Sequence, residues 1–281
     1  MHLKYFGTAA AEGIPGLFCT CRVCEESRRA GGKNLRTRSQ ALVDGKLLID
    51  FPPDIYAHCL YGGLDLPSIT ACIVTHAHED HLYPDDLVFY RQSGYAYDGQ
   101  AGAPHTKPLH IYGSNEVIAL VRARDKEGSE AQGILAPHII TPYTPFEVEG
   151  YTVTALEANH NPATGPVIYC IARDEKTMLY AHDTGVFPTA AWDYLAQTKP
   201  RFDFVSLDCT GMTKAWRDGH MGLPANIEVR DRLIVMGCAD AQTQFCVHHF
   251  SHNGGLTHDE LLPVAAAAGF LTAYDGLELS F

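Results

Sequence analysis

The chain has 281 residues, a length that allows one large domain or two small ones. Hydrophobic residues make up 46% and charged residues 19% of the sequence, which excludes a disordered or fibrous protein. The formal net charge of -12 argues against nonspecific nucleic-acid binding, which requires many cations. No apolar run approaches the roughly 20 residues of a membrane span, and the N-terminal residues do not resemble a signal peptide. We therefore expect a cytoplasmic protein without a membrane partner.

Short β-rich runs separated by Gly, Pro and polar turns dominate the chain. The runs that read as strands are residues 3–6, 40–43, 46–49, 71–75, 109–112, 151–156, 167–172, 177–181, 204–207 and 243–248. Asp44-Gly45 is a strong hairpin signal between the second and third runs. Helices are predicted at 117–127, 190–197, 225–236 and 257–268, and the last begins with a capping box at Thr257 and Glu260.

Strands in series with helices interspersed predict a layered α/β (α+β) fold with covered sheets. We find no repeat or linker, so we expect residues 1–281 to form one domain. Residues 83–108 are rich in Tyr, Gly, Asp and Pro and show no period, which indicates an insertion. Its tyrosines either line and cover a pocket or pack the insertion itself: Tyr83, Tyr90, Tyr95 and Tyr97.

The strongest chemical signal is the run from Thr75 to His81, which follows a β-branched strand. It contains four candidate ligands within six residues: His76, His78, Asp80 and His81. Two imidazoles two positions apart can converge on one ion in an irregular loop, and the Asp and third His can then face a second ion. Two divalent metals about 4 Å apart can activate a water and clamp a leaving oxygen.

A dinuclear site needs further ligands, and His160, Asp183 and His249 each follow an apolar run. Any one of them alone could be a hydrogen-bonded structural residue, but the series indicates ligands. Together with the first motif, HxHxDH, this series resembles the metallo-β-lactamase superfamily. The resemblance implies a four-layer αββα sandwich. It also implies that one metal is bound by His76, His78 and His160, that the other is bound by Asp80, His81 and His249, and that Asp183 bridges them.

Of two further residues beside these ligands, one has a supporting role that the resemblance implies and the other has no assigned role. Asp50, at the end of an early strand, matches a family aspartate that orients the metal loop. His182, directly before Asp183, is either a support for the ligands or a buried polar contact. Asp208 also lies between Asp183 and His249, but the sequence assigns it no role.

Three cysteines cluster near the N-terminus, and the chain resembles the PhnP-like phosphoribosyl cyclic phosphate phosphodiesterases in this respect. That family implies a structural zinc on Cys19, Cys21, Cys24 and His252. Three thiolates and one imidazole would close a tetrahedral site with no open position, which suits a structural ion. The same resemblance implies that His220 acts as a general acid or positions the phosphate, although a histidine in such a loop is often merely solvated.

We therefore predict a dinuclear hydrolase that cleaves a small, cyclic phosphodiester with a hydroxide held between two metals. Zinc, manganese or iron would suit the catalytic ligands, Asp80 could also orient the nucleophile, and His220 would protonate the leaving oxygen. The partner is then a small molecule rather than nucleic acid, and a homodimer is compatible with the sequence. Few cations are expected near the site: Arg36, Arg38, Lys214 and Arg217.

Three alternatives remain. A transfer-RNA 3′-processing endonuclease has the same seven ligands, but it needs a basic docking surface. A thioester or lactone hydrolase has no evident reason to carry the cysteine cluster. A di-iron redox protein would usually have Glu in place of His78, so the sequence argues against it.

Overall fold

Two sheets carry the fold of the described residues, which are 1–90, 96, 107–126 and 128–281 of this computed structural model. The first sheet has the order β14–β1–β2–β3–β4–β5–β6 and the second the order β13–β12–β11–β10–β9–β8–β7. The strands of the first sheet are β14 (Glu278–Ser280), β1 (His2–Gly7), β2 (Gln40–Val43), β3 (Leu47–Ile49), β4 (Ala71–Ile73), β5 (Leu109–Gly113) and β6 (Leu135–Ile139). Those of the second are β13 (Leu271–Thr272), β12 (Gln244–His248), β11 (Phe204–Asp208), β10 (Lys176–Ala181), β9 (Val167–Arg173), β8 (Tyr151–Glu157) and β7 (Phe146–Val148).

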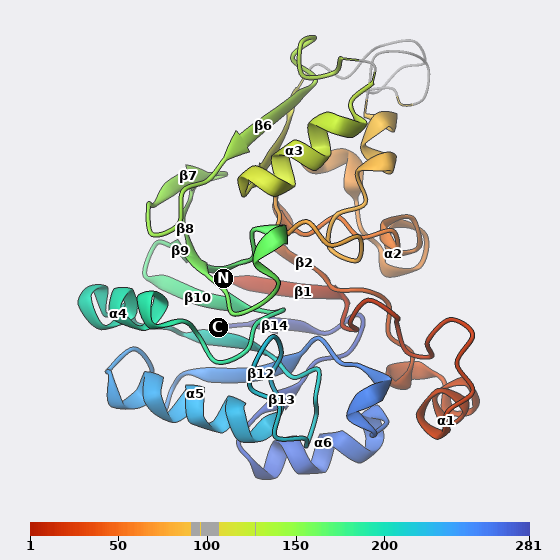
Figure 1. Cartoon of the computed structure of the whole chain (residues 1–281), viewed down its shortest axis with the longest axis vertical. Helices are drawn as coiled ribbons and strands as arrows, with labels where there is room; N and C mark the ends of the chain where they lie inside the picture. The colour runs from red at the N-terminus through yellow and green to blue at the C-terminus, as the bar shows by residue number, and fades with distance from the viewer. Residues whose placement is uncertain (91–95, 97–106, 127) are drawn as a thin grey trace.

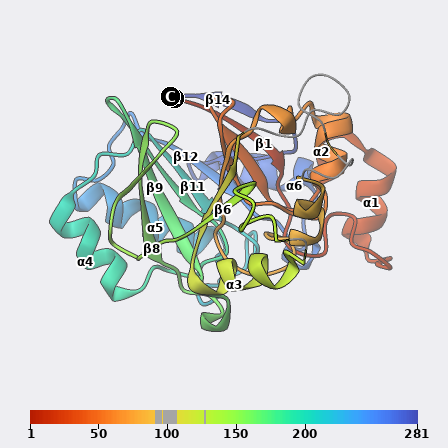
Figure 2. The same cartoon turned by 90° about the horizontal axis from the view of Figure 1, so that it is seen from above.

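Helices cover the outer face of each sheet, so the chain forms the expected four-layer αββα sandwich (Figure 1). The first sheet is covered by α2 (Ile55–Gly62) and α3 (Asn115–Arg124). The second is covered by α4 (Thr189–Thr198), α5 (Leu223–Val235) and α6 (His258–Ala267), and α1 (Arg22–Ala30) lies at one side (Figure 2). Short 3-10 helices complete the chain: η1 (Gly32–Asn34), η2 (Leu66–Ser68), η3 (Pro84–Phe89), η4 (Pro162–Thr164) and η5 (His252–Gly254). None of the described helices is both long and apolar enough to cross a bilayer.

The ten strands predicted from periodicity are all present, whereas β6, β7, β13 and β14 were not predicted. These four strands are the outer edges of the two sheets. Edge strands are short and lack the buried apolar runs of central strands, so their sequence signal is weak. β6 even contains Pro137, which an edge position tolerates because one side of the strand needs no partner.

Local signals for turns and caps are confirmed. Asp44 and Gly45 have φ values of 47° and 69° in the hairpin between β2 and β3, as a tight two-residue turn requires. The Thr257 side chain accepts the Glu260 backbone N–H, and Glu260 caps the Thr257 backbone in return. The helices α1 and α2 were missed, because both are short and only a few of their residues are buried.

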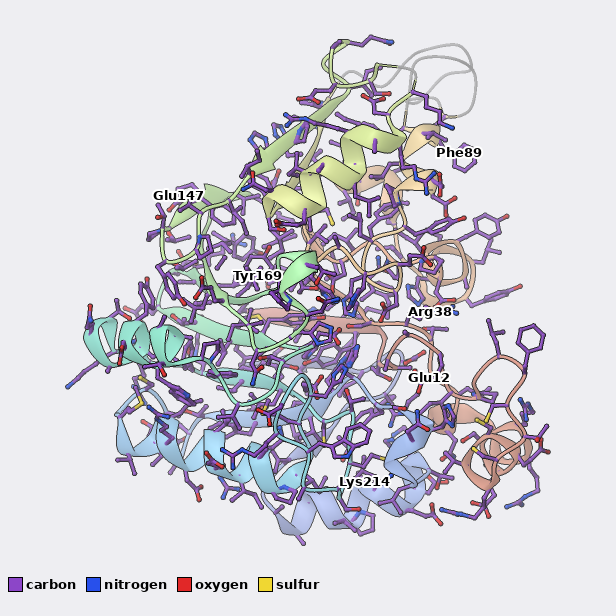
Figure 3. All side chains as sticks on the ribbon, viewed as in Figure 1. Glu12, Arg38, Phe89, Glu147, Tyr169 and Lys214 are labelled. Carbon is purple, nitrogen blue, oxygen red and sulfur yellow. The ribbon has the colours of Figure 1, made fainter. Side chains whose placement is uncertain are left out.

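The main apolar core lies between the sheets and extends beneath α4, α5 and α6. A second apolar cluster packs α2 and α3 against the outer face of the first sheet. Tyr169 of β9 lies in the main core, and its hydroxyl donates to the Val74 carbonyl over 2.7 Å (Figure 3). This contact ties the second sheet to the strand that leads into the His-rich loop. Most of the predicted insertion at 83–108 lies outside the described residues, so its pocket-covering role stays a prediction.

Candidate metal centre and active site

The strand order explains why distant polar residues meet at one edge of the sandwich. β3, β4 and β5 run parallel in the first sheet, and β10, β11 and β12 run parallel in the second. Carboxyl ends of parallel strands lie at the same edge, where open sheets commonly place their ligand sites. Asp50, Asp183 and His249 follow β3, β10 and β12, and the His-rich loop follows β4. The fold therefore brings the predicted ligands together.

The first half of the centre contains three histidines whose ring nitrogens converge. His76 Nε2 lies 2.8 Å from His78 Nδ1, and His160 Nε2 lies 3.2 Å from the same atom. Two imidazole nitrogens bound tetrahedrally to one zinc would be about 3.3 Å apart. The other ring nitrogen of His160, Nδ1, lies 3.0 Å from the Gly219 carbonyl oxygen, and this contact orients the ring. This geometry fits one divalent ion.

The second half of the centre is the buried group of Asp80, His81, Asp183 and His249. Asp183 Oδ2 lies 2.5 Å from His81 Nε2 and 2.9 Å from His249 Nε2, and Asp80 Oδ2 lies 3.3 Å from His81 Nε2. Among the described residues, this buried Asp183 oxygen has no hydrogen bond of acceptable geometry. The carboxylate oxygens and ring nitrogens of this group therefore lie close together, and the Asp183 oxygen is not paired by a hydrogen bond. Such a donor set suits a second divalent ion.

Asp183 is also the residue best placed to face both halves. Its Oδ2 lies 3.9 Å from His76 Nε2, and its Oδ1 lies 3.7 Å from His160 Nε2. Burial alone would raise the pKa of Asp183, but His249 and His81 outweigh burial and hold that pKa well below its ordinary value. The residue therefore provides a buried carboxylate between the two histidine groups.

Residues at strand ends orient these ligands. The buried Asp50 carboxylate accepts the Thr75 backbone N–H over 2.8 Å and lies 2.7 Å from His81 Nδ1. This contact fits the orienting role expected for Asp50. Asp50, Asp183 and His249 all have positive φ values, of 67°, 51° and 59°. Non-glycine residues rarely adopt this conformation, and such strain clusters at functional sites.

Asp208 is a component that the sequence did not assign. It is the last residue of β11, and it is fully buried. Its Oδ2 lies 3.0 Å from His220 Nδ1 and 3.3 Å from His249 Nδ1, while its Oδ1 accepts the Met221 backbone N–H over 2.8 Å. The available sequence signal was its position at the end of an apolar run, the same position that Asp50 and Asp183 occupy.

His220 lies beside this carboxylate at the rim of the cluster. Its side chain is 28% exposed, and its Nδ1 lies 3.5 Å from Asp183 Oδ1. Burial lowers the pKa of His220, but the neighbouring Asp208 carboxylate outweighs burial and raises it above the ordinary value. The fold thus holds Nδ1 against Asp208 and leaves Nε2 as the atom that could meet a substrate.

The structure corrects the sequence expectation for Arg36, and it places His182 in the core as a buried polar contact, one of the two roles expected for it. Arg36 is not available to a substrate: it is buried, donates to Thr8 Oγ1 and the Ala273 carbonyl, and stacks on Phe250. His182 belongs to the core, where its Nε2 lies 2.7 Å from Ser206 Oγ. Strand alternation explains this position, because β10 ends at Ala181 and His182 still faces the opposite sheet.

The other expected cations are partly committed to other contacts. Arg38 pairs with Asp54 at 3.1 Å, and Arg217 pairs with Glu228 at 3.2 Å. Lys214 lies over the Trp216 ring, 5.5 Å from its centroid. Among the described residues, these three cations therefore already have partners close by.

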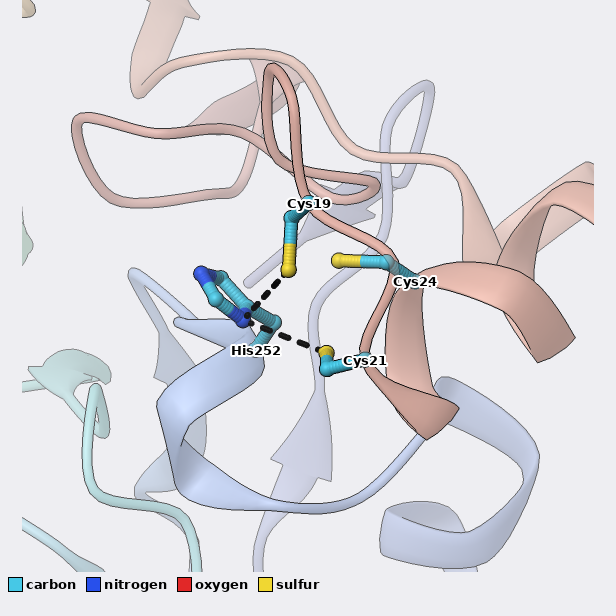
Figure 4. A group of neighbouring side chains, drawn as sticks. All are labelled: Cys19, Cys21, Cys24 and His252. Atoms are coloured by element: carbon cyan, nitrogen blue, oxygen red, sulfur yellow. Dashed lines mark hydrogen bonds between the residues drawn. The ribbon is translucent and has the colours of Figure 1, made fainter.

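The cysteine cluster forms a separate group (Figure 4). His252 Nδ1 lies 3.6 Å from Cys19 Sγ and 3.4 Å from Cys21 Sγ. A thiolate and an imidazole bound to one zinc would be about 3.6 Å apart. Slight burial would raise the pKa of the Cys21 thiol. The Cys24 backbone N–H and the Cys19 and His252 side chains outweigh burial and lower that pKa to about 6. The cluster therefore fits the predicted structural ion.

We expect Cys21→Ser to lose the ion of the cysteine cluster while it keeps the His- and Asp-rich cluster intact. Metal content should fall from about three to about two equivalents per chain, which elemental analysis would measure. The melting temperature should fall as well, by roughly 2–4 °C for each kcal/mol lost. Cys59→Ser, outside the cluster, is the matched control. Full metal content and an unchanged melting temperature in Cys21→Ser would show that the cysteine cluster holds no structural ion.

Residues 46–249 match the family described as the beta-lactamase superfamily domain. This chain belongs to the beta-lactamase superfamily. The match covers the His-rich loop and all seven ligand candidates. For a superfamily member with such a His/Asp cluster, the fold and donor set indicate a metal-dependent hydrolase.

Solved structures share this superfamily fold over the whole chain. A diphosphatase from the PhnP family superimposes with a TM-score of 0.72 at 23% identity, covering 100% of this chain and 96% of that one. The zinc-bound PqqB from Methylobacterium extorquens has a TM-score of 0.73 at 20% identity, covering 100% of both chains. At these identities the likeness shows the fold.

One curated relative is an octanoyltransferase of Porphyromonas gingivalis, 29% identical over 171 residues. The match covers 57% of this superfamily member and 31% of the octanoyltransferase. The chain thus spans about a third of that relative's length.

An apolar pocket of about 510 Å³ lies elsewhere. It is enclosed by α2, η3 and the outer face of the first sheet, and its lining includes Phe51, Tyr56 and Leu87. None of the described ligand candidates lines it. The pocket is therefore separate from the His- and Asp-rich cluster, which contains the candidate metal ligands.

Proposed function

We propose that this superfamily member is a dinuclear metal hydrolase that cleaves a small, cyclic phosphodiester. The observation that carries the proposal is the contact of His220 Nδ1 with Asp208 Oδ2, 3.0 Å apart, directly beside the two ligand groups. When bound, two divalent ions would activate a water and stabilise charge on the phosphate oxygens. The chain itself then has to orient the ligands and provide a proton for the leaving oxygen.

The orientation of His220 supports its role as general acid. Because Asp208 Oδ2 lies 3.0 Å from His220 Nδ1, the Nδ1–H can donate to the carboxylate, and Nε2 of the charged ring can donate to a substrate. The Asp208 carboxylate outweighs burial and raises the pKa of His220, which favours the protonated ring that a general acid requires. An alkoxide leaving group, such as a sugar oxygen, gains most from this proton.

The same pair argues against a thioester substrate. A thiol has a pKa near 8.5, so a thiolate can leave with little help from an acid. An alkoxide is far more basic and needs a proton. A lactone hydrolase would also release an alkoxide, so a substrate panel is needed. We would compare bis-p-nitrophenyl phosphate, a 2′,3′-cyclic nucleotide, a ribose 1,2-cyclic phosphate, a thioester and a lactone. Faster hydrolysis of the thioester or lactone than of every phosphodiester would overturn the proposal.

We expect structured RNA to be ignored by the enzyme. The chain carries a net charge of -12, and Arg38 and Arg217 are already paired. A protein that grips a transfer RNA must instead neutralise many phosphates. Precursor transfer RNA should therefore be neither cleaved nor inhibitory in a hydrolysis assay with a cyclic phosphate at low salt. Cleavage, or inhibition at micromolar RNA, would favour the endonuclease instead.

A further inference from the structure

The hydroxyl of Thr210 is a buried group that lies among the components of the site. Thr210 follows Asp208 by two residues and is only 5% exposed. Its Oγ1 lies 3.0 Å from Asp208 Oδ2, 3.2 Å from His220 Nδ1 and 2.9 Å from His249 Nδ1. It also lies 2.7 Å from the His249 carbonyl oxygen. One hydroxyl therefore contacts the candidate general acid, the carboxylate beside that acid and a ligand candidate.

The single proton of this hydroxyl limits how the contacts can be made. A hydroxyl donates one hydrogen bond and has two lone pairs that can accept. Its proton has two acceptors within reach, the Asp208 carboxylate and the His249 carbonyl. With either acceptor, a lone pair remains for the N–H of a histidine ring.

His249 is the histidine that needs this lone pair. Its Nε2 lies 2.9 Å from Asp183 Oδ2 and is the atom available to an ion. A ring nitrogen that binds a metal carries no proton, so a neutral His249 ring has its proton on Nδ1. Thr210 Oγ1 lies 2.9 Å from this atom, whereas Asp208 Oδ2 lies 3.3 Å from it. The hydroxyl is therefore the closer of these two acceptors.

Asp208 is then left to hold His220. Its Oδ1 already accepts the backbone N–H groups of Met221 and Thr210, over 2.8 and 3.1 Å. Its Oδ2, 3.0 Å from His220 Nδ1, is the oxygen that remains for the general acid. Without the hydroxyl, the Nδ1–H of His249 would turn to the same oxygen and compete with His220.

We propose that Thr210 is a positioning residue that gives the ligand candidate His249 and the general acid His220 separate hydrogen-bond acceptors. The hydroxyl orients the His249 ring through Nδ1, and it keeps Asp208 Oδ2 for His220. The effect on metal binding follows from the ligand geometry alone, whereas the effect on proton donation rests on the proposed function.

Thr210→Val keeps the shape of the side chain and removes the hydroxyl. Chelator competition should show a zinc affinity that is roughly 10–100-fold lower, because the partner of a metal-bound histidine has an effect of that size. With zinc saturating, kcat for a ribose cyclic phosphate should fall further than kcat for bis-p-nitrophenyl phosphate, because the alkoxide needs the proton of His220. Thr210→Ser keeps the hydroxyl and loses the methyl group, so it should resemble the wild-type chain in both assays.

Thr272→Val is the matched control, because Thr272 is also 5% exposed and its hydroxyl has no hydrogen bond among the described residues. It should leave zinc affinity and both kcat values unchanged. If Thr210→Val does not fold by circular dichroism, Thr210→Ala and Thr210→Ser give the same comparison, since these two variants differ only in the hydroxyl oxygen.

A role in packing alone would give the reverse pattern, with Thr210→Ser impaired and Thr210→Val normal, and this result would overturn the proposal. Wild-type zinc affinity in the variant that lacks the hydroxyl would overturn it as well. A wild-type chain that hydrolyses no phosphodiester would instead contradict the proposed function, and the zinc comparison would still decide the role of Thr210.

Discussion

Replacing Asp183 with alanine should abolish hydrolysis of every phosphodiester. Asp183 lies within 3.9 Å of ring nitrogens from both histidine groups, so its loss removes a ligand candidate from each. We expect kcat to fall by more than about 10⁴-fold, beyond the range that a general acid alone contributes. Elemental analysis of the same preparation should show less than the full pair of catalytic ions.

Asp193→Ala provides the matched control, because this carboxylate is exposed on α4 and belongs to none of the described ligand groups. Its activity and metal content should equal those of the wild-type chain. Asp183→Ala with a full metal complement and more than a small fraction of wild-type kcat would contradict the bridging role. A variant that binds no metal and is unfolded would be recognised by circular dichroism, and Asp183→Asn would then replace it.

Replacing His220 with alanine should have an effect that depends on the leaving group. For a ribose cyclic phosphate, whose leaving group is an alkoxide, we expect kcat to fall by about 10²–10⁴-fold. For bis-p-nitrophenyl phosphate the fall should be less than about tenfold, since p-nitrophenolate is stable without a proton. Steady-state kinetics on the two substrates measure this difference directly. Equal losses on both would remove the general-acid role of His220.

Asp208→Asn separates positioning from proton donation. Asp208 contacts both His220 and the ligand candidate His249, at 3.0 and 3.3 Å. Its replacement should therefore slow both substrates, unlike His220→Ala, and should also weaken metal binding. His2→Ala is the histidine control, because His2 begins β1 at the opposite edge of the sheet from the ligand cluster.

The sequence determined the ligand candidates because they come in dense local patterns. The His-rich loop directly follows β4, and His160, Asp183 and His249 each follow an apolar run that is a strand. Ligand chemistry demands these residue types, and strand periodicity predicts where each side chain emerges. The same local logic predicted the hairpin at Asp44-Gly45 and the capping box of α6, because turns and caps depend on a few neighbouring residues.

The tertiary structure decided everything that depends on contacts between distant segments. Asp208 became part of the site only when β11 placed it between His220 and His249. Arg36 is not available to a substrate, because residues far along the chain bury it. The edge strands escaped prediction for the same reason: β6, β7, β13 and β14 are defined by their pairing partner rather than by their own apolar pattern. Ligand types, turns and caps depend on neighbouring residues and can therefore be predicted from the sequence. Burial and strand pairing depend on distant residues and are decided only when the chain folds.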